Sequence, residues 1–128
     1  MQNQEPHTQY ISAAAEDLYD LSMLEEMDDT EYLVEVLNIF LKDTPAEFKE
    51  MKDAVKAGHT ETIAQKAHKI KGSAGIIEAV ELCNLLDGIE KIAKTASIDD
   101  TLKNLVENAQ QLYNIIGQAL KIHIQGLK

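Results

Sequence analysis

Residues 61–77 read ETIAQKAHKIKGSAGII. Apolar side chains recur in this stretch at spacings of four, three, four and three residues: Ile63, Ala67, Ile70, Ala74 and Ile77. This is the period of an α-helix, and it places one continuous apolar stripe along one side of the helix. The stripe predicts a helix from about Glu61 to Ile77 that is packed against other helices.

Helical spacing continues on both sides of this stretch. It predicts further helices over residues 31–57, 79–95 and 101–123, and a helical turn or two over residues 18–27. Only two prolines and six glycines are present, so an all-β fold would lack its turn residues. Short links favour antiparallel neighbours. We therefore expect an all-α protein, an antiparallel up-down four-helix bundle with a short additional N-terminal helix.

Several residues predict where the helices begin and end. Thr30 and Thr60 are placed to cap the helices that follow them, and Gly58 is placed to end the helix before it. Thr44-Pro45 interrupts the first long pattern, and the same pair is also typical of a helix start. The sequence therefore leaves open one kinked helix or two helices in series.

The length of 128 residues suits a single domain. Residues 1–16 are polar, and we expect a flexible leader there followed by one helical domain over residues 17–128. The N-terminus lacks the basic and apolar regions of a signal peptide, and no apolar run is long enough to span a membrane. Cys83 is the single cysteine, and we expect it to be a buried, unreactive thiol. These features favour a cytoplasmic location.

The formal net charge is -10, and the sequence pI is about 4.7. Binding to a nucleic-acid backbone requires basic residues that displace counterions, so the charge disfavours nucleic-acid partners. An anionic membrane surface is disfavoured for the same reason. The acidic balance is compatible with a protein partner.

His68 is predicted to lie away from the apolar stripe, on the outer face of its helix. Ala64 is one turn before it, and Gly72 and Gly75 are one and nearly two turns after it. Each glycine inside a helix costs up to about 1 kcal/mol relative to alanine. Small residues in these places would leave an exposed imidazole on a cleared surface that another protein could approach closely.

Basic residues accompany the histidine. Lys66, Lys69 and Lys71 lie on the same predicted helix, and no acidic residue occurs between Glu61 and Glu78. Lys71 is about one turn after His68, so its ammonium group could reach an anion held at the imidazole. A neutral imidazole is a competent nucleophile, and phosphoryl transfer depends mainly on positioning and charge stabilisation. If His68 receives a phosphoryl group, the outer ring nitrogen, Nε2, is the atom expected to bond to phosphorus.

The segment Ala67-His68-Lys69-Ile70-Lys71-Gly72-Ser73-Ala74 resembles the signature of histidine-containing phosphotransfer (HPt) domains of two-component phosphorelays. The signature is His, any residue, a hydrophobic residue, Lys, Gly and a small polar residue. The resemblance extends from about residue 18 to about residue 120 and includes the stretches 40–45 and 82–90.

This resemblance implies that His68 accepts a phosphoryl group from a receiver-domain aspartate and passes it to another receiver. It implies that Lys71 stabilises the phosphoryl group and that Gly72 makes room for the receiver. The expected partners are response-regulator receiver domains and a sensor or hybrid histidine kinase. The chain would be a stoichiometric carrier rather than an enzyme, and a monomer.

We expect the docking surface to be the face around His68 together with the adjoining face of the preceding helix. Its candidate contacts are Ala64, Gln65, Lys69, Gly75 and Ile76. The alternative is a helical adaptor that docks a receiver or other protein through the same face without carrying phosphate.

The chain departs from the family pattern in two places. Many members have a glycine about ten residues after the histidine, where this chain has Glu78. Gly58-His59 stands where an acidic residue often opens the histidine helix. Neither departure touches the His-x-x-Lys-Gly core.

No cofactor or metal site is expected from the sequence. Helical bundles can bind metals through Glu-x-x-His pairs, but no histidine here has Glu three positions before it. A single cysteine excludes a zinc site built from several cysteines. The phosphate-binding and nucleophile motifs GxxxxGK[ST], GxGxxG and GxSxG are absent from the sequence.

Overall fold

The structure is a computed structural model that describes residues 15–95 and 97–127. Over these residues the chain forms one short 3-10 helix and five α-helices. The elements are η1 (Ala15–Leu18), α2 (Ser22–Glu25), α3 (Thr30–Ala57), α4 (Thr60–Ile76), α5 (Val80–Ala93) and α6 (Asp100–Leu127). The predicted leader lies outside the described residues, except for its last two residues, which belong to η1.

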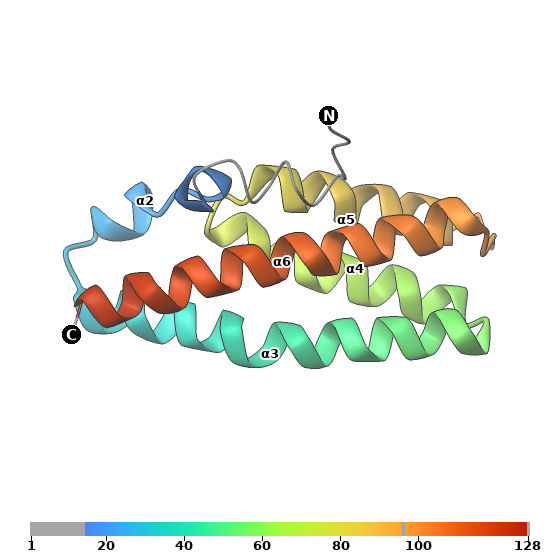
Figure 1. Cartoon of the computed structure of the whole chain (residues 1–128), viewed down its shortest axis with the longest axis horizontal. Helices are drawn as coiled ribbons and strands as arrows, with labels where there is room; N and C mark the ends of the chain where they lie inside the picture. The colour runs from blue at the N-terminus through green and yellow to red at the C-terminus, as the bar shows by residue number, and fades with distance from the viewer. Residues whose placement is uncertain (1–14, 96, 128) are drawn as a thin grey trace, which may run out of the picture.

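The four long helices form a bundle in which consecutive helices run in opposite directions (Figure 1). α4 packs against both α3 and α5, and α6 closes the bundle by packing against α5 and α3. Because the connections are short, each helix folds back beside the one before it. The predicted up-down four-helix bundle with a short additional N-terminal helix is confirmed.

The apolar stripe of α4 is buried, as the sequence predicts. Its four members within the helix, and Ile77 directly after it, are each at most 1% exposed: Ile63, Ala67, Ile70, Ala74 and Ile77. They meet fully buried side chains from the other helices, including Leu37, Phe48, Leu82, Leu86, Leu112 and Ile116. Burial of this stripe fixes the rotation of α4 and therefore turns its opposite side toward solvent.

α3 is a single helix, which decides between the two alternatives that the sequence left open. Thr44 and Pro45 lie inside it, and Thr44 is 3% exposed rather than a cap. Proline has no N–H, so the carbonyl of Leu41 loses its usual helical donor. The Tyr113 hydroxyl of α6 donates to that carbonyl at 3.4 Å. A neighbouring helix thus supplies the hydrogen bond that Pro45 removes.

The predicted caps Thr30 and Thr60 are wrong by one residue. Asp29 is the cap of α3, and its carboxylate accepts a hydrogen bond from the Tyr32 amide at 3.0 Å. His59 holds the equivalent place before α4 without a side-chain bond. A carboxylate caps at least as well as a hydroxyl, so Asp29 takes the position.

α6 continues past the predicted end at His123, to Leu127. Ile124 is 5% exposed and extends the apolar face of the helix, which explains the extra turn. His123 therefore lies inside the helix, where its Nε2 is 3.6 Å from a carboxylate oxygen of Glu25. Among the described residues, no helix has the length and apolar character that crossing a membrane requires.

The end of α4 contains an unusual backbone conformation. Glu78 has φ = 50°, in the left-handed region that favours glycine. Its amide donates to the Gly75 carbonyl at 3.1 Å, and the next amide, of Ala79, donates to Ala74 at 3.0 Å. Gly58, with φ = 77°, ends α3 with an equivalent pair of bonds: its amide donates to Val55, and the next amide, of His59, donates to Ala54. The departure at Glu78 therefore places a side chain where the backbone favours glycine.

Candidate functional site

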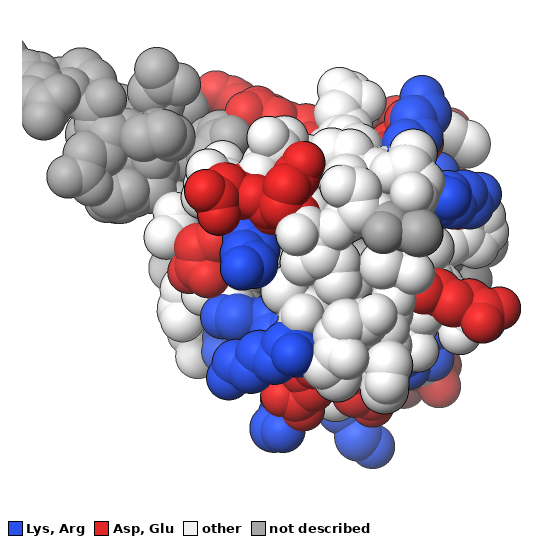
Figure 2. Space-filling view, turned by 90° about the vertical axis from the view of Figure 1, so that its right-hand side faces the viewer, with Lys and Arg blue, Asp and Glu red and all other residues white. Residues whose placement is uncertain are grey.

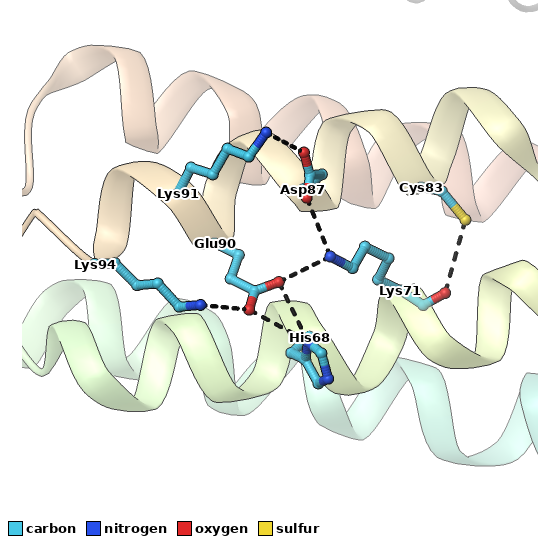
Figure 3. Close-up of polar contacts among 7 residues, drawn as sticks. All are labelled: His68, Lys71, Cys83, Asp87, Glu90, Lys91 and Lys94. Atoms are coloured by element: carbon cyan, nitrogen blue, oxygen red, sulfur yellow. Dashed lines mark hydrogen bonds and ion pairs between the residues drawn. The ribbon is translucent and has the colours of Figure 1, made fainter.

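His68 lies on the exposed side of α4, beside α5, and 71% of its side chain is exposed. Its Nδ1 faces Glu90 of α5, at 3.2 Å from Oε2 and 3.4 Å from Oε1. The second ring nitrogen points away from α5 (Figure 3). An ionised carboxylate can only accept a hydrogen bond, so Nδ1 carries the proton of the neutral ring and Nε2 keeps its lone pair.

Glu90 is a buried carboxylate, only 7% exposed. Besides His68, it contacts the ammonium groups of Lys71 at 3.0 Å and Lys94 at 3.1 Å. The hydrogen bond from Lys71, with those from Lys94 and His68, lowers the pKa of Glu90 to about 2 although burial acts in the opposite direction. Glu90 therefore stays ionised at neutral pH and can orient the imidazole.

Lys71 extends toward α5 rather than into solvent (Figure 3). Its ammonium lies 3.0 Å from Oε1 of Glu90 and 3.1 Å from Oδ1 of Asp87. The hydrogen bonds to Glu90 and Asp87 raise the pKa of Lys71. The other oxygen of Asp87 pairs with Lys91 at 2.9 Å. Lys71 is thus one turn from His68, as expected, but it is held by two carboxylates.

The other two lysines of α4 are also paired, with carboxylates of α3. Lys66 lies 3.0 Å from Glu47 and 2.6 Å from Glu50. Lys69, although 63% exposed, lies 2.6 Å from Glu47. The basic helix that the sequence predicts is therefore neutralised by its neighbours. Figure 2 shows basic and acidic side chains next to one another around an uncharged area at the end of the bundle with the α3–α4 and α5–α6 connections.

Gly72 and Gly75 are exposed, and a Cβ atom added at either position would meet nothing within 4 Å. Their surroundings are therefore open in the isolated protein. Ala64, by contrast, is only 8% exposed, which corrects the expectation that it lies on the open face. Its methyl group is too short to rise above the junction of α4 and α5, whereas the longer side chain of His68 does.

A groove of about 590 Å³ runs along the same junction, beside His68. The lining residues come from the first half of α4, from the end of α5 and from Lys94 directly after it: Thr60, Glu61, Ala64, Gln65, His68, Glu90, Ala93 and Lys94. Gln65 is exposed, and Ile76, farther along α4, is 55% exposed. The candidate docking residues are therefore exposed, apart from Ala64, which is buried but contributes to the lining of the groove.

Asp87, Glu90 and Lys94 belong to the site but were not predicted as site residues. Asp87 and Glu90 lie on α5 and Lys94 directly follows it, at spacings of three and four residues, so the three share one face of that helix. This spacing was the available signal. It could not show that the face turns toward His68, because the rotation of α5 depends on packing between the helices.

Cys83 is half-buried rather than buried, and its Sγ lies 3.7 Å from the Lys71 carbonyl. Burial raises the pKa of the thiol, which disfavours the reactive thiolate. Within residues 15–95 and 97–127, no group of three or more His, Cys, Asp or Glu side chains could hold a metal ion.

Comparison with known proteins places this geometry in a family. Residues 35–126 match the Hpt domain family. The fold is similar to the crystal structure of histidine-containing phosphotransfer protein B (HptB) from Pseudomonas aeruginosa PAO1, with a TM-score of 0.78 and 23% sequence identity. That match covers 84% of this chain and 95% of the other. No curated protein matches the chain.

The Hpt match covers most of the chain and includes all of α4 and α5, which carry His68 and its charged neighbours. The protein therefore belongs to the Hpt domain family and acts in histidine phosphotransfer within a phosphorelay.

Proposed function

We propose that His68 is the phosphorylated residue, which accepts the group on Nε2 from a receiver-domain aspartate and passes it to another receiver. The observation that carries the proposal is the 3.2 Å contact between Nδ1 and Glu90. It holds the proton on the inner nitrogen and leaves the outer nitrogen as an exposed nucleophile. The protein is then a stoichiometric carrier and not an enzyme in the turnover sense.

The transfer balances without an added proton. A bond forms between Nε2 and phosphorus while the bond from phosphorus to the aspartate oxygen breaks, and the carboxylate leaves with the electron pair. Nδ1 keeps its proton, so the ring becomes positively charged as the new bond forms. The carboxylate of Glu90 lies beside that charge and stabilises it, as a preorganised anion does in other histidine-dependent sites.

The remaining histidines lack this arrangement or lie elsewhere. His59 precedes α4 and makes no side-chain cap bond, and His123 faces Glu25 at the opposite end of the bundle from the α3–α4 connection. His7 lies outside the described residues. Among residues 15–95 and 97–127, His68 alone combines high exposure with a close contact to a buried carboxylate.

The docking surface in this proposal is the face around His68. Gly72 and Gly75 have no side chains that would hold a partner away from this face. Gln65, Lys69 and Ile76 offer polar, basic and apolar contacts. The partners are receiver domains, together with the sensor or hybrid kinase that feeds them. Any Mg²⁺ in the reaction belongs to the receiver, and a carrier that meets one receiver at a time functions as a monomer in the cytoplasm.

Transfer from a phosphorylated receiver tests the proposal. The wild-type protein should take up an acid-labile label, and His68→Gln should take up none. His59→Gln is the matched control, because it removes an exposed histidine at the start of the same helix and should leave labelling unchanged. If receivers bind the wild type but none labels it, the carrier proposal is wrong and the adaptor alternative is favoured.

A further inference from the structure

In the structure, the ammonium group of Lys71 is already bound by two carboxylates and would have to move to contact a phosphoryl group on His68. A phosphoryl group on Nε2 would carry about two negative charges, and Lys71 is the lysine one turn away that could neutralise them. In the structure its ammonium is instead held at 3.1 Å from Asp87 and 3.0 Å from Glu90. To contact the phosphoryl oxygens, Lys71 has to give up at least part of this bonding.

The two carboxylates are not equivalent. Glu90 contacts the imidazole itself, so a lysine bonded to Glu90 remains beside the reacting ring. Asp87 lies one turn before Glu90 on α5, and it contacts Lys71 and Lys91. No contact between Asp87 and His68 is found among the described residues. Figure 3 shows Lys71 reaching between the two carboxylates. Asp87 therefore draws the ammonium away from the ring.

We infer that Asp87 is a positioning residue that competes with the phosphoryl group for Lys71 and so weakens the hold on phosphate at His68. This inference rests on the proposed function. Its consequence is a phosphohistidine with higher transfer potential, which suits a carrier that must release the group to the next receiver. The affected quantity is the equilibrium between the free and phosphorylated protein.

Phosphoryl exchange with phosphoimidazole measures this equilibrium without a partner protein. The nitrogen–phosphorus bond of phosphoimidazole breaks, imidazole leaves with the electron pair, and the bond from phosphorus to Nε2 of His68 forms. One nitrogen–phosphorus bond replaces another, so the exchange constant reports mainly the surroundings of His68. It can be read from ³¹P NMR signals, approached from both directions.

Asp87→Asn should raise the exchange constant about threefold, because the amide no longer competes for the Lys71 ammonium and a single exposed ion pair contributes only modestly. Glu81→Gln is the control. It removes the same charge from an exposed position on α5, and no contact between Glu81 and Lys71 is found among the described residues. Measurement at about 0.5 M salt suppresses long-range charge effects common to both variants. Thermal unfolding confirms that each variant is folded.

A double-mutant cycle with Lys71→Gln separates competition from simple repulsion. If Asp87 acts through Lys71, then Asp87→Asn in the Lys71→Gln background should change the exchange constant no more than Glu81→Gln does. A full threefold effect in that background would overturn the inference, as would an unchanged constant for Asp87→Asn alone. Either result leaves the carrier role intact. Failure of the wild type to form any phosphohistidine would instead refute both.

Discussion

Glu90 is the residue on which the charged groups around His68 converge. It binds one imidazole and two ammonium groups while being almost completely buried. Its carboxylate sets the protonated nitrogen of the ring, and its negative charge holds Lys71 and Lys94 on the same side of α5. A change at Glu90 should therefore affect chemistry more than it affects docking.

Glu90→Gln should slow single-turnover transfer to His68 by roughly 10- to 100-fold, the cost found when a carboxylate that orients a metal-binding histidine is lost. The amide no longer stabilises the ring charge and no longer fixes the tautomer. In ¹⁵N NMR spectra the neutral ring should show a mixture of both tautomers.

Glu47→Gln provides the control for this prediction. Glu47 is also a largely buried carboxylate that binds two lysines of α4, but it lies on the α3 side of the helix. Glu47→Gln should leave the transfer rate within about twofold of the wild type, since no bond between Glu47 and the ring is found among the described residues. Equal losses in both variants would mean that Glu90 acts only through general stability.

The role proposed for His68 could be inferred from the sequence because its evidence is local. The apolar stripe, the glycines and Lys71 all lie on the same helix, so helical periodicity alone relates them. Glu90 and Asp87 could not be assigned in this way. They reach His68 and Lys71 only because α5 packs beside α4 with one particular rotation.

At the scale of helices, the connection between α4 and α5 contains an energetic penalty at Glu78. A non-glycine residue in the left-handed region costs roughly 1–2 kcal/mol. Glu78→Gly should therefore raise the free energy of unfolding by about 1 kcal/mol, the smaller figure because glycine also gains freedom in the unfolded chain. Chemical denaturation measures the difference.

Gly58→Ala is the reciprocal test, because Gly58 occupies the same position at the end of α3. It should lower the free energy of unfolding by about 1 kcal/mol, because alanine is strained in the left-handed region. The open surroundings of Gly58 add no steric conflict to that cost. If Glu78→Gly is neutral or destabilising, contacts of the Glu78 side chain outweigh the backbone cost.

The hydrogen bond from Tyr113 compensates for the one that Pro45 removes from α3. Tyr113→Phe should lower the free energy of unfolding by about 1 kcal/mol, because the Leu41 carbonyl then loses its substitute donor. In a Pro45→Ala background the new amide can bond Leu41, so the same substitution should cost less. An equal cost in both backgrounds would contradict the proposed compensation.

Helix positions could be predicted more closely than helix ends. The stripes of α3 to α6 follow from spacing, but a cap depends on which of two neighbouring polar residues turns its side chain back to the helix. Asp29 and Thr30 are such a pair, and their order in the chain does not decide between them. The hydrogen bond that replaces the one lost at Pro45 comes from Tyr113, far away in sequence.

At the scale of the whole molecule, the exposed side of α4 around Gly72 and Gly75 allows effects on stability to be distinguished from effects on binding of a partner. Gly72→Gln should not harm the isolated protein, because the space around Gly72 is open and glutamine favours a helix more than glycine does. It should raise the thermal midpoint slightly and leave phosphorylation by phosphoimidazole unchanged. It should reduce transfer from a receiver by at least about tenfold, the cost of roughly 1.4 kcal/mol of steric conflict.

Gly126→Gln is a suitable control for this experiment. Gly126 is likewise exposed on a helix with nothing within 4 Å of an added Cβ, but it lies near the end of α6. Its transfer from a receiver should match the wild type. Normal transfer by Gly72→Gln would show that this position does not meet the partner.

The order of helices in the bundle also has a kinetic consequence. Contacts between α3 and α4, α4 and α5, and α5 and α6 join neighbours in sequence, whereas the pairing of α3 with α6 must close a long loop. Chains dominated by local contacts fold quickly, and loop closure is their slow, entropically costly part. We therefore expect α4 and α5 to associate before the bundle closes, so that His68 meets Glu90 early in folding. Pulse-labelling hydrogen exchange would detect this as protection of α4 and α5 before that of the ends of α3 and α6.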